Sequence, residues 1–151
     1  MTFGKSISTC FSKYATFSGR ASRSEYWWWQ LFAGIIGFIA YFILVGKATH
    51  DTLTSPGMMY DIDSDPGFST LGGVVFGIIW LVLLLPSLAV LFRRLHDTGR
   101  SGWWFLLNFI PIANIAVLVF TLLPTEPSDN KYGPVPEGVY NYPPANRNSQ
   151  Y

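Results

Sequence analysis

The sequence predicts an all-α fold: a small polytopic membrane helical bundle of three transmembrane helices, preceded by an N-terminal amphipathic interfacial helix. Of the 151 residues, 50% are hydrophobic and 13% are charged, which is apolar for a soluble domain of this size. Residues 26–45, 71–92 and 103–123 contain no Asp, Glu, Lys, Arg or His. A helix of about 20 residues measures roughly 30 Å, the hydrocarbon thickness of a bilayer. One soluble core does not accommodate three such helices in so short a chain.

The chain divides into an N-terminal segment (residues 1–25), a three-span membrane domain (26–123) and a proline-rich, largely disordered tail (124–151). The first apolar run begins too late and continues too long to be a cleaved signal peptide. The single cysteine, Cys10, excludes an internal disulfide, and only two histidines are present. We therefore expect no metal site and no cofactor. A net charge of +1, with the basic residues at membrane edges, gives no reason to expect a nucleic-acid partner.

Residues 3–17 have the pattern of a short amphipathic helix. Apolar residues recur at steps of three and four, which places them on one helical face. Such a helix either lies in the membrane interface, with its lysines near anionic headgroups, or packs on the cytoplasmic side of the protein itself. The apolar positions are Phe3, Ile7, Cys10, Phe11, Tyr14 and Phe17.

The first membrane helix is expected to begin near Ser22 or Arg23. Gly19 permits a sharp change of direction, and Ser22 with Glu25 three residues later has the spacing of a capping box. The three tryptophans at 27–29 are typical of the aromatic belt at a membrane boundary.

Residues 46–70 read as an acidic extramembrane loop. Asp61, Asp63 and Asp65 resemble the opening of a calcium loop, but Pro66 occupies the place of the obligatory glycine and Gly72 that of the closing glutamate. A plain solvated loop is therefore favoured over a calcium site.

The second run contains Gly73 and Gly77, the small-xxx-small spacing that lets helix backbones approach closely. Pro86 should kink this helix unless a neighbour satisfies the freed carbonyl. Gly99 suits a helix C-terminus and Ser101 an N-cap, so a tight helical hairpin is expected to lead into the third run.

The third run carries Asn108, Pro111 and Asn114. Amides in hydrocarbon need partners, so these side chains should face other helices or a wet cavity. We expect a third full span with the tail outside. The alternative is a broken, re-entrant segment, which would return the tail to the inside.

The distribution of Lys and Arg predicts the orientation. The N-terminal segment has four such residues and the turn at residues 93–102 has three, against one in the acidic loop and two in the tail. The N-terminus and the turn are therefore expected to be cytoplasmic, with loop 46–70 outside.

Three motifs resemble the small bacterial inner-membrane proteins grouped as domain of unknown function 805. They are FSGRASRSEYW at residues 17–27, RRLHDTGRSGWW at 93–104 and NKYGPVP at 130–136. Val135 stands where such proteins more often have an acidic residue, and the first extramembrane loop looks longer than usual. The resemblance implies a multi-span helical fold in the bacterial inner (plasma) membrane. It implies no activity, because the family has none assigned.

The charged residues of the first two motifs form the candidate site. In one interpretation they anchor helix ends and pair with one another, Arg93 with Asp97 four residues on and Glu25 as the second anion. In the other they bind anionic lipid headgroups or a partner protein, since the arginines outnumber the carboxylates. The candidate contact residues are Arg20, Arg23, Arg93, Arg94, His96 and Arg100.

We therefore expect a non-enzymatic accessory or scaffold protein with a basic cytoplasmic face, either alone or as a homo-oligomer. A subunit of an oligomeric transporter or channel is the alternative, with Gln30, Asn108 and Asn114 lining a pore. An enzyme that uses His96 and Asp97 is less favoured, because adjacent residues on a helix point in different directions. No catalytic residue is assigned.

Overall fold

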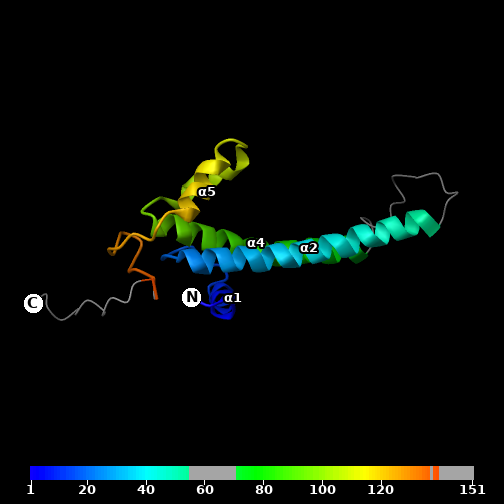
Figure 1. Ribbon diagram of the computed structural model, residues 1–151, viewed down its shortest axis with the longest axis horizontal. Helices are drawn as coiled ribbons and strands as arrows, with labels where there is room; N and C mark the ends of the chain where they lie inside the picture. The colour runs from blue at the N-terminus through cyan, green and yellow to red at the C-terminus, as the bar shows by residue number, and fades with distance from the viewer. Residues whose placement is uncertain (55–70, 137, 140–151) are drawn as a thin grey trace, which may run out of the picture.

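The structure, a computed structural model, describes residues 1–54, 71–136, 138 and 139. Within these ranges every regular element is a helix, so the all-helical class is confirmed for them (Figure 1). The elements in chain order are α1 (Phe3–Ser12), α2 (Arg23–Thr54), α4 (Leu71–Asp97), the 3₁₀ helix η2 (Gly102–Phe109) and α5 (Asn114–Leu122).

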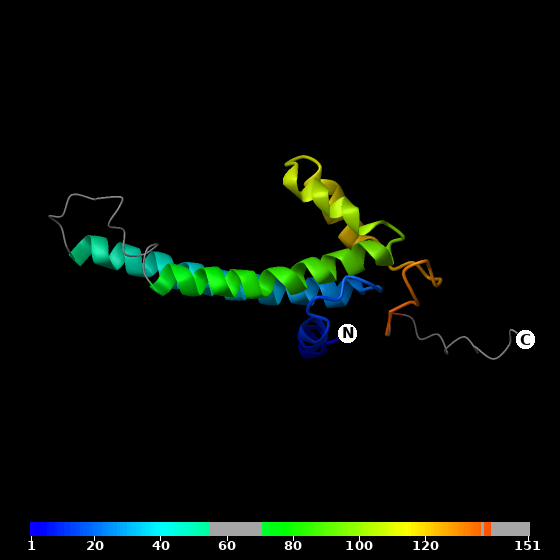
Figure 2. The same cartoon turned by 180° about the vertical axis from the view of Figure 1, so that it is seen from behind.

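Helices α2 and α4 lie side by side and run in opposite directions (Figures 1 and 2). Their segments Arg23–Ile43 and Gly73–Asp97 are long and apolar enough to cross a membrane. Large apolar side chains point outward along both, with Phe38 63% and Leu81 64% exposed. Such a surface is stable against lipid and costly against water.

The start of α2 agrees with the prediction. The Glu25 backbone N–H donates to Ser22 Oγ over 3.2 Å, so Ser22 caps the helix that begins at Arg23. The helix then continues to Thr54, so residues 46–54 are helical instead of forming part of a loop. The three aspartates of the calcium-like stretch, at 61, 63 and 65, lie outside the described residues.

Pro86 lies inside α4, and a side chain from the turn that follows α1 satisfies the carbonyl that it frees. A proline has no N–H to donate four residues back, which leaves the carbonyl of Val82 without its helical partner. The Tyr14 hydroxyl donates to this carbonyl over 2.6 Å. One turn later Ser87 Oγ accepts from Trp29 Nε1 over 2.9 Å, which ties α2 to the same part of α4.

A continuous third span over residues 103–123 is not confirmed. The run is divided into η2 and α5, which are joined by a reversal (Figure 1). Ile110, the residue before Pro111, has φ −108° and ψ 114°. Proline disfavours helical geometry in the residue that precedes it, so the helix ends there. The two limbs form a helical hairpin whose ends both lie beside the C-terminal end of α4 (Figure 2).

Helix α1 packs on the N-terminal half of α2. The rings of Phe3 and Trp28 meet edge to face at 5.5 Å, and those of Phe11 and Trp29 at 5.2 Å. The amphipathic segment is therefore helical over Phe3–Ser12 and contacts the protein itself, as one of its two interpretations required. Its location in a membrane interface stays a prediction.

Residues 124–136, the first part of the proline-rich tail, follow a defined path. Asn130 and Gly133 pair as an isolated antiparallel bridge, and this turn packs against the end of α4. The rest of the tail, from residue 140, lies outside the described residues. We call the region where residues 17–27, 93–104 and 130–136 meet the motif end of the molecule.

The hydrophobic core is small and belongs to the motif end. It joins α1, α2, α4 and α5 through Cys10, Trp29, Leu95 and Val117, all buried. Beyond this end, α2 and α4 contact mainly each other. The fold thus concentrates its packing where the three motifs meet.

Candidate functional site

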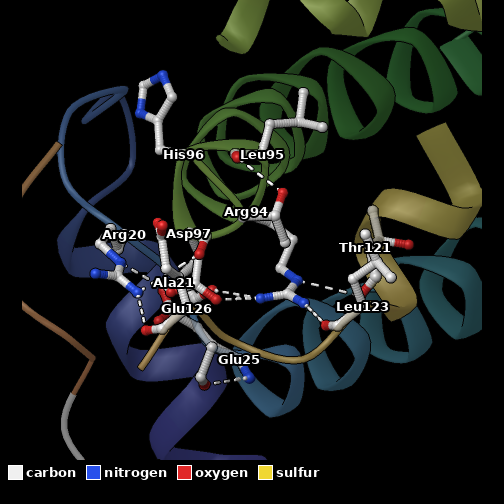
Figure 3. Close-up of polar contacts among 12 residues, drawn as sticks. Arg20, Ala21, Glu25, Arg94, Leu95, His96, Asp97, Thr121, Leu123 and Glu126 are labelled. Carbon is white, nitrogen blue, oxygen red and sulfur yellow. Dashed lines mark hydrogen bonds and ion pairs between the residues drawn. The ribbon is translucent and has the colours of Figure 1, made fainter. Parts of the chain in front are cut away.

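A buried ionic cluster occupies the motif end. We define it as Arg20, Glu25, Arg93, Arg94 and Asp97, whose exposure ranges from 0% to 5%. Arg20 and Glu25 come from the link before α2 and its first turn, and the other three from the last turns of α4 (Figure 3). Burial of five ionisable groups in one small core requires that each be paired or hydrogen-bonded.

Asp97 is the centre of the cluster. Its Oδ1 accepts from Arg20 Nε over 2.9 Å, and its Oδ2 accepts from Arg94 Nη1. All three side chains are fully buried. Both carboxylate oxygens are therefore occupied by guanidinium groups, which leaves Asp97 no free oxygen for a ligand.

Arg94 binds the end of the helical hairpin. Its Nε donates to the Thr121 carbonyl over 3.1 Å, and its Nη2 donates to the Leu123 carbonyl. The last carbonyls of a helix have no partner within the helix, and the helix dipole is negative there. A cation at this point satisfies both requirements, so Arg94 fixes the return of the hairpin to α4.

Arg20 binds the segment that leads into the third motif in the same way. Its Nη1 donates to the Ser128 carbonyl over 2.7 Å, and its Nη2 donates to the Glu126 carbonyl over 2.6 Å. Asn130 closes the contact, because its Nδ2 donates to the His96 carbonyl over 3.0 Å and to Glu126 Oε2 over 2.7 Å. The three motifs are thus joined by side chains that donate to backbone carbonyls.

Arg93 does not pair with Asp97, which corrects the expected pair. Arg93 donates to Glu25 Oε1, and Asp97 accepts from Arg94 at i,i+3 instead. Neighbouring helical residues point about 100° apart, so Arg93 faces α2 while Arg94 faces the hairpin. Within the described residues, Arg93 Nε and Nη2 are buried without a hydrogen-bond acceptor.

The cluster contains three arginines and two carboxylates, and carbonyl oxygens accept the remaining N–H groups of Arg20 and Arg94. The excess of positive charge seen in the sequence is therefore largely satisfied within the protein. Backbone carbonyls that accept hydrogen bonds from arginine cannot be recognised in a sequence. The count of charged residues alone therefore suggested that an external anion was needed.

The other three contact candidates lie outside the cluster. Arg23 is exposed. Arg100 donates from Nη1 to the Thr98 carbonyl over 3.1 Å and places its guanidinium 4.0 Å above the Phe120 ring. The structure thus separates the six candidates into three buried arginines, one exposed arginine and the half-buried Arg100 and His96.

His96 and Asp97 face different neighbours. The His96 ring stacks on the Tyr132 ring at 3.9 Å with an interplanar angle of 3°, and its Nδ1 lies 3.3 Å from the Gly19 carbonyl. Asp97 points instead into the ionic cluster. The two side chains therefore form no hydrogen-bonded dyad of the kind that acid–base catalysis uses.

Most of the residues that the sequence assigned to helix packing are exposed or have no close neighbour in the described chain. A Cβ built on Gly77 would meet no atom within 4 Å. No other helix of the described chain therefore approaches this glycine closely. Gly73 is half-buried, while Asn108 and Asn114 are exposed on the hairpin. Any packing role of Gly77 and the two amides therefore requires a neighbour from outside the described chain.

Cys10 is buried beside the cluster. Burial raises the pKa of its thiol to about 11, and the nearby Glu25 carboxylate adds to this effect while Arg93 opposes it. The thiol is thus protonated near neutral pH and unreactive. Among the described residues, no three His, Cys, Asp or Glu side chains gather to hold a metal ion.

Comparison with known proteins places these motifs in a family. Residues 14–134 match the family described as "Protein of unknown function (DUF805)". The chain is 36% identical over 127 residues to "Inner membrane protein YhaH" of Escherichia coli K12, which covers 82% of this chain and 89% of that protein. It is also 36% identical over 125 residues to "Inner membrane protein YhaI" of the same strain, covering 82% and 88%. No solved structure matches the chain.

Proposed function

Because this chain belongs to the DUF805 family of proteins of unknown function, we propose a function from its own geometry. The protein is a non-enzymatic scaffold of the inner membrane. The ionic cluster holds its motif end as a rigid cytoplasmic platform, whose exposed cations bind anionic lipid headgroups or a partner protein. The observation that carries this proposal is that buried Arg20 and Arg94 share Asp97 and bind backbone carbonyls of residues 121–128. Asn130 then ties the third motif to the His96 carbonyl.

In the proposed topology α2 and α4 cross the membrane, and the helical hairpin enters and returns on the cytoplasmic side. The N-terminus, the turn at 93–102 and residues 124–136 then share that side, with residues 55–70 outside. The bonds of Arg94 to the end of α5 support this arrangement. Its limbs of eight and nine residues measure about 16 and 14 Å, half of a bilayer.

The proposed headgroup contacts belong to exposed cations, because each buried arginine already pairs with a carboxylate of the protein. Lys5, Lys13, Arg23 and Lys131 are exposed in segments at the motif end (Figure 1). A cation near an anionic leaflet contributes about 1 kcal/mol of attraction. Four exposed cations therefore favour binding to an anionic membrane surface, and this binding requires no preformed pocket.

The first experiment tests the topology. In a Cys10→Ser background, single cysteines at Ser64 and Ser101 are labelled from either side of the membrane, and a compartment reporter follows Tyr151. We expect Ser64 outside, with Ser101 and the reporter inside. A reporter on the outside would contradict the re-entrant hairpin and return the third run to a full span.

The second experiment tests headgroup binding by native mass spectrometry of protein released from mixed phosphatidylglycerol and phosphatidylcholine membranes. Replacement of the four exposed cations by alanine should reduce the retained phosphatidylglycerol. The matched control changes Lys5, Lys13 and Lys131 to Arg, which keeps the charge and should keep the lipid. Equal retention by the alanine variant would remove headgroup binding from the proposal.

An oligomeric transporter or channel subunit remains the second candidate function. The observation that favours it is the exposure of Asn108 and Asn114 on an otherwise apolar hairpin. Amides that face lipid lack hydrogen-bond partners. Amides that line a water-filled path in an oligomer can hydrogen-bond to water.

A further inference from the structure

The tip of the helical hairpin presents polar groups at a depth where lipid cannot satisfy them. The tip comprises residues 108–114, in which η2 ends, the chain reverses and α5 begins. Among the described residues, the side-chain amides of Asn108 and Asn114 make no hydrogen bond. Phe109 and Ile112 beside them are 76% and 83% exposed. The tip therefore has no cover within the described chain (Figure 1).

The depth of the tip follows from the lengths of the two limbs. Trp103, 71% exposed at the start of η2, is of the type that marks a membrane boundary. Asn108 lies five residues further on, which is about 10 Å at the rise of a 3₁₀ helix. Asn114 is eight residues before Leu122, which is about 12 Å in an α-helix. Both amides thus lie close to the midplane of a bilayer whose half-thickness is about 15 Å.

Irregular backbone and unpaired amides are not stable against hydrocarbon. They occur at membrane depth only where protein or trapped water covers them. The core packing at the motif end does not reach the tip, because the hairpin diverges from α2 and α4 (Figures 1 and 2). Within the described residues, therefore, nothing covers the tip.

We infer that a second copy of this chain covers the tip, so that two hairpins meet tip to tip within the membrane. An amide both donates and accepts, so Asn108 and Asn114 of one copy satisfy the same two residues of another around a two-fold axis. The apolar side chains of Phe109, Ile110 and Ile112 flank the amides and pack against their counterparts. The inference rests on the proposed re-entrant topology and adds a partner to it.

Disulfide cross-linking in native membranes tests the contact. In the Cys10→Ser background, Ile112→Cys should form a covalent dimer on oxidation, whereas Phe38→Cys, an exposed position on α2, should stay monomeric. Replacing Asn108 and Asn114 by Leu in the Ile112→Cys chain should lower the cross-linked fraction. Hydrogen bonds between membrane helices change association about 3-fold to 30-fold, and the Leu variant keeps the apolar contacts. Asn114→Gln should retain most of the dimer.

The outcomes separate the contact from the topology. A reporter after Tyr151 inside the cell together with monomeric Ile112→Cys would overturn the second copy and leave the proposed topology standing. A cross-link of Ile112→Cys to a different protein would equally overturn it. A reporter outside would refute the topology itself, whatever the cross-linking shows.

Discussion

Asp97→Asn tests whether the ionic cluster holds the motif end together. The substitution keeps the shape of the side chain and one carbonyl oxygen, but it removes the negative charge that Arg20 and Arg94 share. Two buried guanidinium groups would then face a neutral amide, one of whose atoms is itself a donor. We expect the motif end to open more often, while α2 and α4 remain inserted.

The size of the expected shift in the opening equilibrium follows from the burial of the two ion pairs of Asp97. Removal of one partner of a buried ion pair costs about 3–5 kcal/mol, because the other charge is left without compensation. The amide oxygen still accepts one hydrogen bond, so the lower value of about 3 kcal/mol applies. An opening equilibrium that shifts by this amount changes about 150-fold.

The chain contains its own reporter for this opening. Cys10 is the only cysteine, is fully buried and contacts the core of the motif end. In detergent micelles, the rate of Cys10 labelling by a maleimide follows the opening equilibrium when closing is faster than labelling. We expect labelling of Asp97→Asn to be about 150-fold faster than that of the unmodified protein.

The matched control is Asp129→Asn, the same change at an exposed carboxylate. Asp129 Oδ1 accepts from the Val135 N–H over 3.1 Å, and an amide oxygen can replace it there. Its labelling rate should stay within about twofold of the unmodified protein. If Asp97→Asn and Asp129→Asn label at the same rate, the ionic cluster does not stabilise the motif end and our reasoning is wrong.

Three further predictions concern the packing around the cluster. A titration of the Cys10 thiol in the closed protein should give a pKa of about 11, since burial favours the protonated thiol. Tyr14→Phe should lower the free energy of unfolding by about 1 kcal/mol, measured by thermal denaturation in micelles, because the Val82 carbonyl loses its donor. Gly102→Ala should destabilise by about 1–3 kcal/mol in the same assay, since its Cβ would lie 2.3 Å from Phe92 Cδ1.

Each of these has its own control. A thiol that titrates near pH 8.5, as a free cysteine does, would contradict the burial of Cys10. Tyr41→Phe removes the same hydroxyl at an exposed position and should leave the unfolding temperature unchanged. Gly4→Ala enters open space inside a helix and should stabilise the protein slightly. Destabilisation by Gly4→Ala equal to that of Gly102→Ala would show that the Phe92 contact is not the cause.

The sequence was sufficient for the parts of the fold that depend on composition. Charge-free runs located α2 and α4, and the Ser22–Glu25 spacing located the start of α2. The third run is not confirmed as a span, because it divides into η2 and α5. Composition and length do not distinguish such a hairpin from a crossing helix. Pro111 was the useful signal, since it excludes helical geometry at Ile110, but a kinked continuous helix carries the same residue.

For the candidate site, the sequence identified the residues and not their arrangement. Arg93 and Arg94 both lie within a helical turn of Asp97, so spacing alone did not decide which of them pairs with it. The deciding contacts are long-range. Arg94 reaches the carbonyls at the end of α5, and Arg20 reaches those of residues 126 and 128. Only the tertiary structure brings these carbonyls near.

The bonds of Arg94 to the end of α5 also set an order for biosynthesis. The Leu123 carbonyl is made 29 residues after Arg94, which is roughly 1.5–6 s later at the usual rates of translation. During that interval Arg20 and Arg94 can pair with Asp97 but lack the carbonyl acceptors that residues 121–128 supply. The motif end therefore closes only after both long helices, α2 and α4, have been made.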